Sequence, residues 1–239
     1  MSIFQKVVKK DDVEQVTDNL GGFILEADAY ELTIEAAYAD VSKGGANFVS
    51  LHATTPDGRR YREDMYFTSG TEKNTSYTYE RNGKTFYLPG YIQVDHLVTL
   101  VNGHDISAIE TERKYINKYN PDLGKEVPTE VDMIVGLQGK KIGATILKNL
   151  EDKTIAGDDG KRVKTGETRE TNSIDRFYDV DTGLTVVESV DGIEEATYVP
   201  AWVIKNKGKV RDKTDKKGGS GAKAGAPGGK PRASLFKKS

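Results

Sequence analysis

Residues 29–39 read AYELTIEAAYA, and their apolar and polar side chains alternate along the chain. Alternation with a period of two is typical of a strand that is buried on one side. The apolar face that it predicts consists of Tyr30, Leu32, Ile34, Ala36 and Tyr38. Residues 47–55, NFVSLHATT, repeat the pattern and predict a second strand with Val49, Leu51 and Ala53 on one side. The sequence therefore predicts a β domain that begins near residue 21.

Turn sequences divide the next part of the chain into further elements. Pro56-Asp57-Gly58 predicts a turn before a returning strand over 59–68. Arg81-Asn82-Gly83 separates 77–80 from 84–88, and Asn-Gly tolerates the positive φ angles of a type I′ hairpin turn. Residues 91–102 predict a helix that ends at Gly103, and residues 105–119 predict a second helix.

The second half of the chain adds strands and one more hairpin. The predicted features are strands over 130–137 and 141–150, a tight hairpin at Gln138-Gly139, a strand within 164–179, a turn at 181–183 before the segment 184–190, and a closing segment over 198–204. Short strands, glycine turns and an inserted helix predict a mainly β protein, an OB-fold-like five-stranded barrel with an inserted hairpin and one or two short helices. A β-sandwich is the rival fold, and the pattern does not separate the two.

Charge is distributed unevenly along the chain. Residues 205–239 contain twelve basic and two acidic residues, which leaves 23 basic and 35 acidic residues in 1–204. Opposed charge of this kind predicts contact with a polyanion, or a tail that folds back on the acidic body. The tail is poor in apolar side chains, which predicts a disordered, flexible linker. The expected organisation is an N-terminal extension (1–20), a β domain (21–204) and a basic tail (205–239).

Several classes of protein are disfavoured by what the sequence lacks. The 239 residues include no cysteine, which excludes disulfides, Cys-ligated zinc and a thiol nucleophile. No apolar run approaches about 18 residues and the N-terminus does not resemble a secretory signal, so we expect a cytoplasmic protein without membrane contact. Phosphate-loop, dinucleotide-binding and Gly-x-Ser-x-Gly motifs are absent. Asp95, His96, His104 and Asp105 suggest a metal site, but turn and surface roles are favoured. We expect no catalysis, metal or cofactor.

Residues 59–91 combine aromatic and basic side chains. They hold eight of the chain's twenty aromatic residues, interleaved with Arg and Lys. Such rings stack on unpaired bases and neighbouring cations contact phosphates, which is the composition of a single-strand-binding groove. The alternative is that these rings favour strands and belong to the core. Alternation predicts Tyr61, Met65 and Phe67 inside, with Phe48 an exposed ring on the neighbouring strand. The predicted DNA-binding residues are Phe48, Arg60, Arg62, Tyr66, Tyr77, Tyr79, Arg81, Lys84 and Tyr87.

Five short segments carry a resemblance to a known family. They are GGF at 21–23, the strand at 47–55, KTFYLPGYI at 84–92, EVPTE at 126–130 and VGLQGK at 135–140. With these segments the chain resembles the single-stranded DNA-binding proteins of tailed bacteriophages over residues 20–200. The resemblance implies an OB-fold without catalysis that coats and protects unwound DNA during phage replication, recombination and repair in the host cytoplasm.

The C-terminal tip differs from most proteins of the wider single-strand-binding class, which end in an acidic tail with an aromatic residue near its tip. Here Leu235, Phe236, Lys237 and Lys238 end a basic tail. Some phage members are similar and direct a basic C-terminus to the host RNA polymerase. We expect replication or transcription proteins to bind this tip, and copies of the chain to associate cooperatively on single-stranded DNA. The alternatives are a structural or assembly protein with a basic tether, and a Mg²⁺-dependent nuclease.

Overall fold

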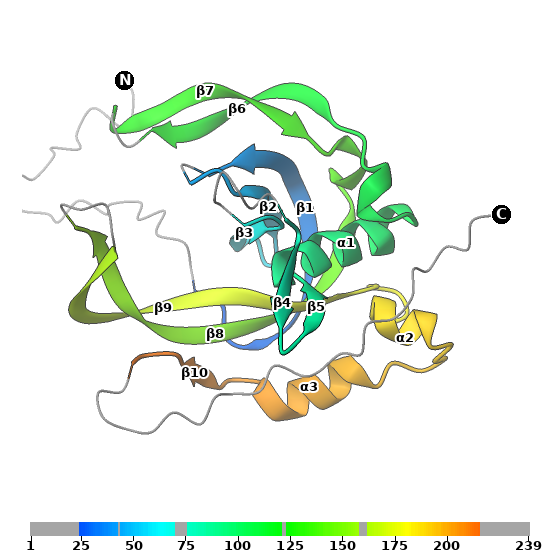
Figure 1. Ribbon diagram of the computed structural model, residues 1–239. Coiled ribbons are helices and arrows are strands. Elements are labelled where there is room, and N and C mark those ends of the chain that lie inside the picture. The colour runs from blue at the N-terminus through cyan, green and yellow to red at the C-terminus, as the bar shows by residue number, and fades with distance from the viewer. Residues whose placement is uncertain (1–23, 43, 70–75, 121–122, 158–161, 216–239) are drawn as a thin grey trace, which may run out of the picture.

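One large, almost entirely antiparallel sheet dominates the protein (Figure 1). The computed structural model describes residues 24–42, 44–69, 76–120, 123–157 and 162–215. The predictions made for the N-terminal extension and for most of the basic tail therefore lie outside the described residues. The strands of the sheet are β1 (Asp28–Val41), β2 (Asn47–Thr54), β3 (Arg60–Tyr66), β6 (Glu112–Asn120), β7 (Lys125–Met133), β8 (Lys141–Ala156), β9 (Arg162–Tyr178) and β10 (Val210–Asp212). The predicted mainly β class is confirmed.

Strand β1 connects the parts of the sheet because it changes partners along its length. Its first part pairs with β8 and its later part with β2, and it also pairs briefly with β7. A register shift between Ile34 and Ala36 marks a β-bulge, which changes the side that the following residues face. Leu32 and Ile34 enter the main core, whereas Tyr38 enters a second cluster with side chains of β7. The prediction of one continuous apolar face over 30–38 is therefore wrong beyond the bulge.

Five strands follow one another in the order β9-β8-β1-β2-β3, and the two outer strands do not close into a barrel. Within the described residues, no backbone ladder joins β3 to β9. The carboxylate of Glu63 on β3 bridges this seam, because its Oε2 accepts a hydrogen bond from the backbone N–H of Ile174 on β9 at 2.7 Å. The hydroxyl of Tyr61 donates to the same oxygen. Burial raises the pKa of Glu63 to about 7, although both hydrogen bonds oppose the shift.

Helix α1 (Pro89–Asn102) covers the main core and confirms the helix predicted over 91–102. Val94, Leu97 and Val98 are buried against the sheet. The helix ends as expected, because Gly103 is left-handed at φ 76° and its N–H donates to the carbonyl oxygen of Thr99. Glycine adopts this conformation without the steric cost of a side chain.

Two other predictions of local structure are wrong. The second helix predicted over 105–119 is a short 3₁₀ helix, η2 (Ile106–Ala108), followed by β6, because β7 supplies backbone partners for the whole of β6. Gln138-Gly139 does not form a hairpin, because β7 and β8 pair with other strands and a 3₁₀ helix, η3 (Val135–Leu137), leads from one to the other.

The C-terminal part of the domain is more helical than expected. The segments at 184–190 and 198–204 form helices α2 (Val186–Val190) and α3 (Tyr198–Asn206), so the described chain contains three α-helices. Glu188 caps α2 and also accepts hydrogen bonds from the N–H groups of Thr197 and Tyr198 at the start of α3. Asp175 on β9 accepts hydrogen bonds from Tyr198 and Trp202 of α3, at 2.8 and 2.7 Å. These polar contacts fix α3 on the outer side of the sheet.

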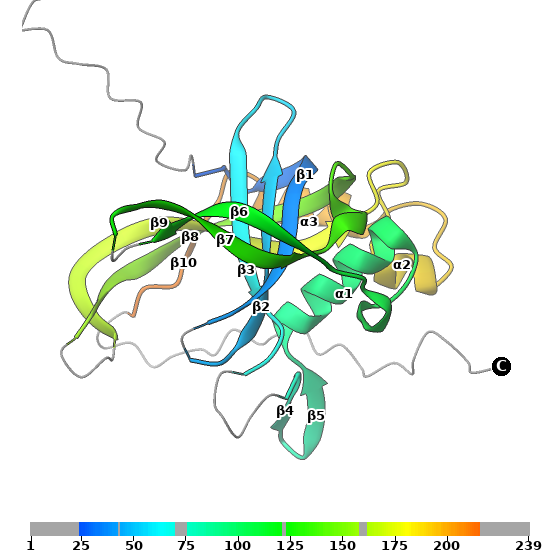
Figure 2. The same ribbon diagram turned by 90° about the horizontal axis from the view of Figure 1, so that it is seen from above.

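Two long hairpins, β6–β7 and β8–β9, extend to the same side of the molecule in both ribbon views (Figures 1 and 2). A third hairpin forms a separate two-stranded sheet from β4 (Thr78–Arg81) and β5 (Lys84–Tyr87). Its turn is the predicted one, since Asn82 and Gly83 have φ angles of 54° and 69°. Figure 2 shows this third hairpin projecting from the body beside the start of α1.

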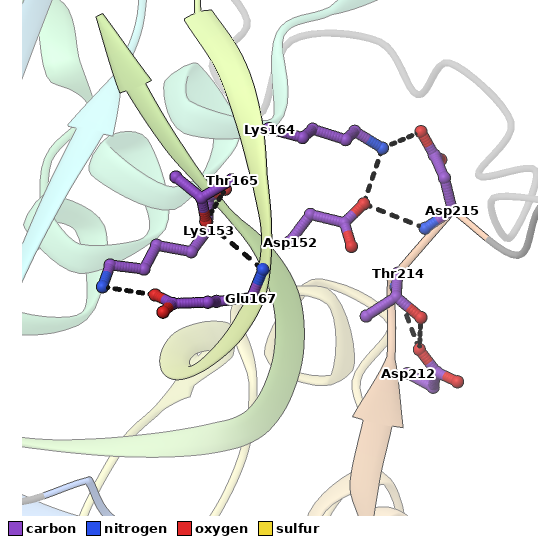
Figure 3. A network of polar contacts seen from close by, with 8 residues as sticks. All are labelled: Asp152, Lys153, Lys164, Thr165, Glu167, Asp212, Thr214 and Asp215. Atoms are coloured by element: carbon purple, nitrogen blue, oxygen red, sulfur yellow. Dashed lines mark hydrogen bonds and ion pairs between the residues drawn. The ribbon is translucent and has the colours of Figure 1, made fainter.

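The last described residues run along the β8–β9 hairpin (Figure 3). Strand β10 pairs in parallel with β8, on the edge that β1 leaves. Beyond it, the N–H of Asp215 donates to Asp152 at 3.1 Å, and Lys164 forms ion pairs with both carboxylates. Lys213 adds a 3.1 Å ion pair with Glu151. The described part of the basic tail, residues 205–215, therefore ends on the outer half of this hairpin.

Candidate nucleic-acid interface

Strand β3 presents two chemically different sides, as alternation predicts. Tyr61 and Met65 are buried in the main core. Arg60, Arg62 and Tyr66 are exposed on the other side. Strand β2 pairs with β3 along its whole length, and Val49 and Leu51 face the core with Met65. The outer side of β2–β3 is therefore a surface with cations toward one end and an aromatic ring at the other.

Phe48 is not the exposed ring that the sequence predicts. It is 8% exposed, and its ring lies beside that of Tyr66, its partner in the β2–β3 register, with centroids 5.1 Å apart. Phe48 does face away from Val49 and Leu51, so alternation placed it on the correct side of the strand. Alternation predicts the side of the strand that a residue faces but not what covers it, and here the Tyr66 ring lies against Phe48. Phe48 supports the exposed Tyr66 ring and is not itself a platform for a base.

A glycine allows α1 to approach the end of β3. A Cβ atom on Gly90 would lie 1.9 Å from the carbonyl oxygen of Tyr66 and 2.5 Å from its carbonyl carbon. Any other residue would clash with backbone, which cannot rotate away as a flexible side chain can. The first turn of α1 is thereby held against Tyr66. This close contact at Gly90 positions Tyr91, and the β4–β5 hairpin that precedes it, beside β3.

Three nearly parallel tyrosine rings lie where the β4–β5 hairpin meets α1. Tyr91 stacks with Tyr87 and with Tyr77, at centroid separations of 4.8 and 5.2 Å and interplanar angles of 12° and 24°. Tyr77 and Tyr87 are only 6.1 Å apart, which is too short for Tyr91 to lie between them in a single column. Tyr77 and Tyr87 therefore lie beside one another against Tyr91, and each of these two is 51% exposed. We call Tyr77, Tyr87 and Tyr91 the tyrosine platform.

Tyr91 belongs to this platform, although the predicted site omitted it. Burial raises its pKa to about 12, with the nearby Asp95 carboxylate as the next cause, so its hydroxyl is neutral at physiological pH. The sequence contained a signal, because Tyr91 follows the Pro-Gly pair at which a helix begins. Residues in the first turn of that helix must lie near the end of the preceding hairpin.

The other side of the β4–β5 hairpin combines aromatic and basic groups. Tyr79 and Phe86 are paired in register, and their rings stack with centroids 5.6 Å apart. Arg81 and Lys84 are the next residues of the same side and flank the turn. Both are exposed, and within the described residues neither forms an ion pair. This places predicted stacking residues and phosphate-binding residues next to one another.

The predicted site residues thus form two groups that meet at Tyr66. The first group follows β3, where Arg62 lies 3.6 Å from Asp64 and Arg60 has no ion pair among the described residues. The second group is the β4–β5 hairpin with the platform. Tyr66 lies four positions after Arg62, which amounts to about 13 Å along a strand. A single strand of nucleic acid that contacted both groups would run along β3 toward the hairpin.

His52 lies on the same side of the sheet and is a neutral group there. Its Nε2 lies 3.3 Å from the hydroxyls of both Tyr38 and Ser50. Ser50 in turn donates to Asp64 at 2.6 Å. Burial lowers the pKa of His52, and the charge of Arg62 lowers it further. His52 is therefore a positioning group within a polar cluster and does not supply positive charge for phosphates at neutral pH.

The residues considered for a metal site serve other roles. Asp95 accepts a hydrogen bond from the N–H of Ile106, and Asp105 caps the 3₁₀ helix through Ser107. His96 is separate from them, and burial together with Arg176 lowers its pKa to about 4. The described part of the chain contains no group of three or more potential metal ligands. The predicted partner-binding residues, Leu235 to Lys238, lie outside the described residues.

Comparison with known proteins gives no assignment, because no family model and no curated protein matches the chain. In the described ranges, none of the helices combines the length and the apolar character that a membrane crossing requires.

Proposed function

We propose that this chain is a non-catalytic, sequence-independent single-stranded DNA-binding protein of the kind found in tailed bacteriophages. It would coat and protect unwound DNA during replication and recombination. The observation that carries the proposal is the tyrosine platform, which lies near the exposed Tyr66 at the end of β3. Exposed cations lie on both sides of it, Arg60 and Arg62 toward the start of β3 and Arg81 and Lys84 at the turn of the β4–β5 hairpin. Aromatic faces accept any base, and basic neighbours track the phosphates without reading sequence.

The topology supports the proposal. The order β9-β8-β1-β2-β3, with α1 between β3 and β8, is the arrangement that an open OB-fold would have. OB-folds bind oligonucleotides across the face of their second and third strands. The β3 cations lie on the corresponding face, and the β4–β5 hairpin extends that face beyond the end of β3. In the same proposal, the tip at Leu235–Lys238 recruits a replication or transcription partner.

The test is a titration of the full-length protein into fluorescent oligothymidine, with a duplex of equal length as the comparison. We expect tighter binding of the single strand and an affinity that falls as salt rises. Equal or absent binding of the two forms would overturn the proposal and leave an assembly protein with a basic tether. Cleavage of the oligonucleotide on addition of Mg²⁺ would overturn the non-catalytic part.

A further inference from the structure

The outer face of the β6–β7 hairpin is a second exposed aromatic surface. Tyr115 and Tyr119 are 73% and 66% exposed, more than any tyrosine of the platform. Both point away from the body, because the alternate residues of β6 are half-buried on the inner side. Unlike the platform rings, neither forms a ring contact with another aromatic residue of the described chain. Nothing in the proposed DNA-binding role uses them.

Negative charge surrounds these two rings. Register pairing places Glu130 opposite Tyr115 and Glu126 opposite Tyr119. The full outer face consists of Arg113, Tyr115, Asn117 and Tyr119 from β6, with Glu126, Pro128, Glu130 and Asp132 from β7. It therefore carries three carboxylates and one guanidinium, and that guanidinium lies 3.6 Å from Glu130. Such a surface repels phosphates and attracts a cationic segment that also has apolar side chains.

The inner face of the same hairpin is occupied, which fixes the outer face in place. Val131 and Met133 are buried against Tyr38 of β1, with Ile116 packed beside them. Lys118 forms an ion pair with Asp40 of β1 and lies over the Tyr38 ring at 5.6 Å. The hairpin is therefore attached to the body by apolar and ionic contacts. Its outer face is a preformed surface and needs no rearrangement to bind a segment.

We propose that the C-terminal tip of the same chain, Leu235–Lys238, docks on this outer face. Leu235 and Phe236 would cover Tyr115 and Tyr119, and Lys237 and Lys238 would meet Glu126 and Glu130. The chemistry of the segment matches the surface, because two large apolar residues are followed by two cations. Residues 216–239 contain seven basic residues and no acidic one. The whole segment therefore carries the charge that the surface attracts.

The length of the intervening chain allows the contact. Leu235 lies twenty positions after Asp215, and a chain of that length spans at most about 65–70 Å. A body of this size has a radius of gyration of about 16 Å, so the tip can reach any part of its surface. The segment begins on the β8–β9 hairpin, which extends to the same side as β6–β7 (Figures 1 and 2).

The tether also decides between the chain's own tip and that of another copy. A short tether gives an effective concentration of roughly 1 mM, far above a micromolar solution of the protein. The docked tip is therefore intramolecular in dilute protein. A partner that captures the tip has to displace it from β6–β7, so docking would control when the tip is available.

The experiment is photo-crosslinking from the tip of the full-length protein. Phe236→p-benzoylphenylalanine is irradiated at submicromolar concentration, and the cross-linked peptides are identified by mass spectrometry. We expect intramolecular products with residues 112–133. The pair Glu126→Lys and Glu130→Lys should lower their yield about tenfold, since reversal of two ion pairs changes binding by about that factor. Adding Lys237→Glu and Lys238→Glu should restore the yield.

The matched control is Glu194→Lys with Glu195→Lys, which makes the same charge change in the exposed segment between α2 and α3. This control should leave the yield unchanged. Products elsewhere on the body, an equal loss in the control, or failure of the charge swap to restore the yield would overturn the proposal. Predominant cross-linked dimers would overturn the intramolecular form. Oligothymidine binding, measured on the same variants, reports the proposed DNA-binding function separately and should be retained in all of them.

Discussion

The β4–β5 hairpin and the β6–β7 hairpin both expose tyrosines, but they differ in the charge beside the rings. Tyr79 and its neighbours share their hairpin with Arg81 and Lys84, whereas Tyr115 and Tyr119 face Glu130 and Glu126 across the strands. Both hairpins expose tyrosine rings of the same chemical kind. In the two proposals, the charges beside the rings, and not the rings themselves, select between a nucleic acid and a basic peptide.

The two regions also differ in how they are attached. The β4–β5 hairpin forms a sheet of its own and is held by ring stacking and by the close approach of Gly90 to Tyr66. The β6–β7 hairpin belongs to the main sheet and has its own apolar cluster. A change at the α1–β3 contact should therefore disturb the first region and spare the second.

The largest expected effect is that of Gly90→Ala. The added methyl group clashes with the backbone of Tyr66, so we expect a loss of about 3 kcal/mol in the free energy of unfolding, measured with urea. Gly58→Ala is the control, because Gly58 is also constrained, at φ 83°, but has open space around it. It should cost about 1 kcal/mol. Equal costs for the two variants would show that the α1–β3 contact is not tight.

The next effect separates the two aromatic regions by DNA affinity. We expect Tyr87→Ala to weaken oligothymidine binding by about 1–3 kcal/mol, the value of one stacked base. Tyr119→Ala should change the affinity by less than about twofold, because acidic side chains surround that ring. Fluorescence anisotropy at fixed salt measures both. If Tyr119→Ala weakened binding as much as Tyr87→Ala, the charge argument for the two regions would fail.

Alternation of side chains predicted much of this framework from sequence. The β2–β3 pair, the Asn82-Gly83 turn and the end of α1 at Gly103 follow from local patterns, and all three are confirmed. The β-bulge after Ile34 did not follow, because it depends on β1 pairing with three different strands. Strand β6 was predicted as a helix, because the backbone partners that make it a strand belong to a separate segment, β7.

The candidate site shows the same division. Composition identified the rings and cations of 59–91, and alternation placed Arg60, Arg62 and Tyr66 on the outer side of β3. Neither composition nor alternation identified Phe48 as covered or Tyr91 as part of the platform, because both depend on contacts between separate elements. The acidic setting of Tyr115 also needed the strand register, which no local pattern supplies.

The third effect concerns the seam beneath β3. The folded-state pKa of Glu63 is about 7, above its ordinary value of 4.5, so the protonated form favours folding. The contribution of the protonated Glu63 to the free energy of unfolding is complete below pH 4.5 and is lost as the pH rises through 7. We expect Glu63→Gln to keep the hydrogen bond from Ile174 and to raise the free energy of unfolding at pH 8 by about 1–2 kcal/mol. Urea unfolding at pH 5 and pH 8 measures it.

The control for the seam is Glu195→Gln, an exposed carboxyl in the segment between α2 and α3. It should leave the pH dependence unchanged. Because Glu63 lies on the strand that supports Tyr66 and not on β6–β7, the gain should come with unaltered cross-linking of the tip to 112–133. An identical pH profile for Glu63→Gln and the unmodified protein would show that the seam carboxyl does not titrate with folding.

The smallest effect is a change in salt dependence, and it tests the comparison through charge alone. In the proposed complex, neutralising Arg81 or Lys84 would remove one phosphate contact, so the slope of log affinity against log salt should decrease in magnitude by about 0.7 for each. Arg113→Gln removes the same charge from the β6–β7 face, where it already lies near Glu130, and should leave the slope unchanged. Oligothymidine titrations at several salt concentrations give the three slopes. These substitutions leave the aromatic rings in place. A smaller salt slope in the Arg81 and Lys84 variants would therefore assign phosphate contact to the β4–β5 hairpin without any change in stacking. An equal loss at Arg113 would instead extend the DNA path over the acidic face, and charge would no longer distinguish the two hairpins.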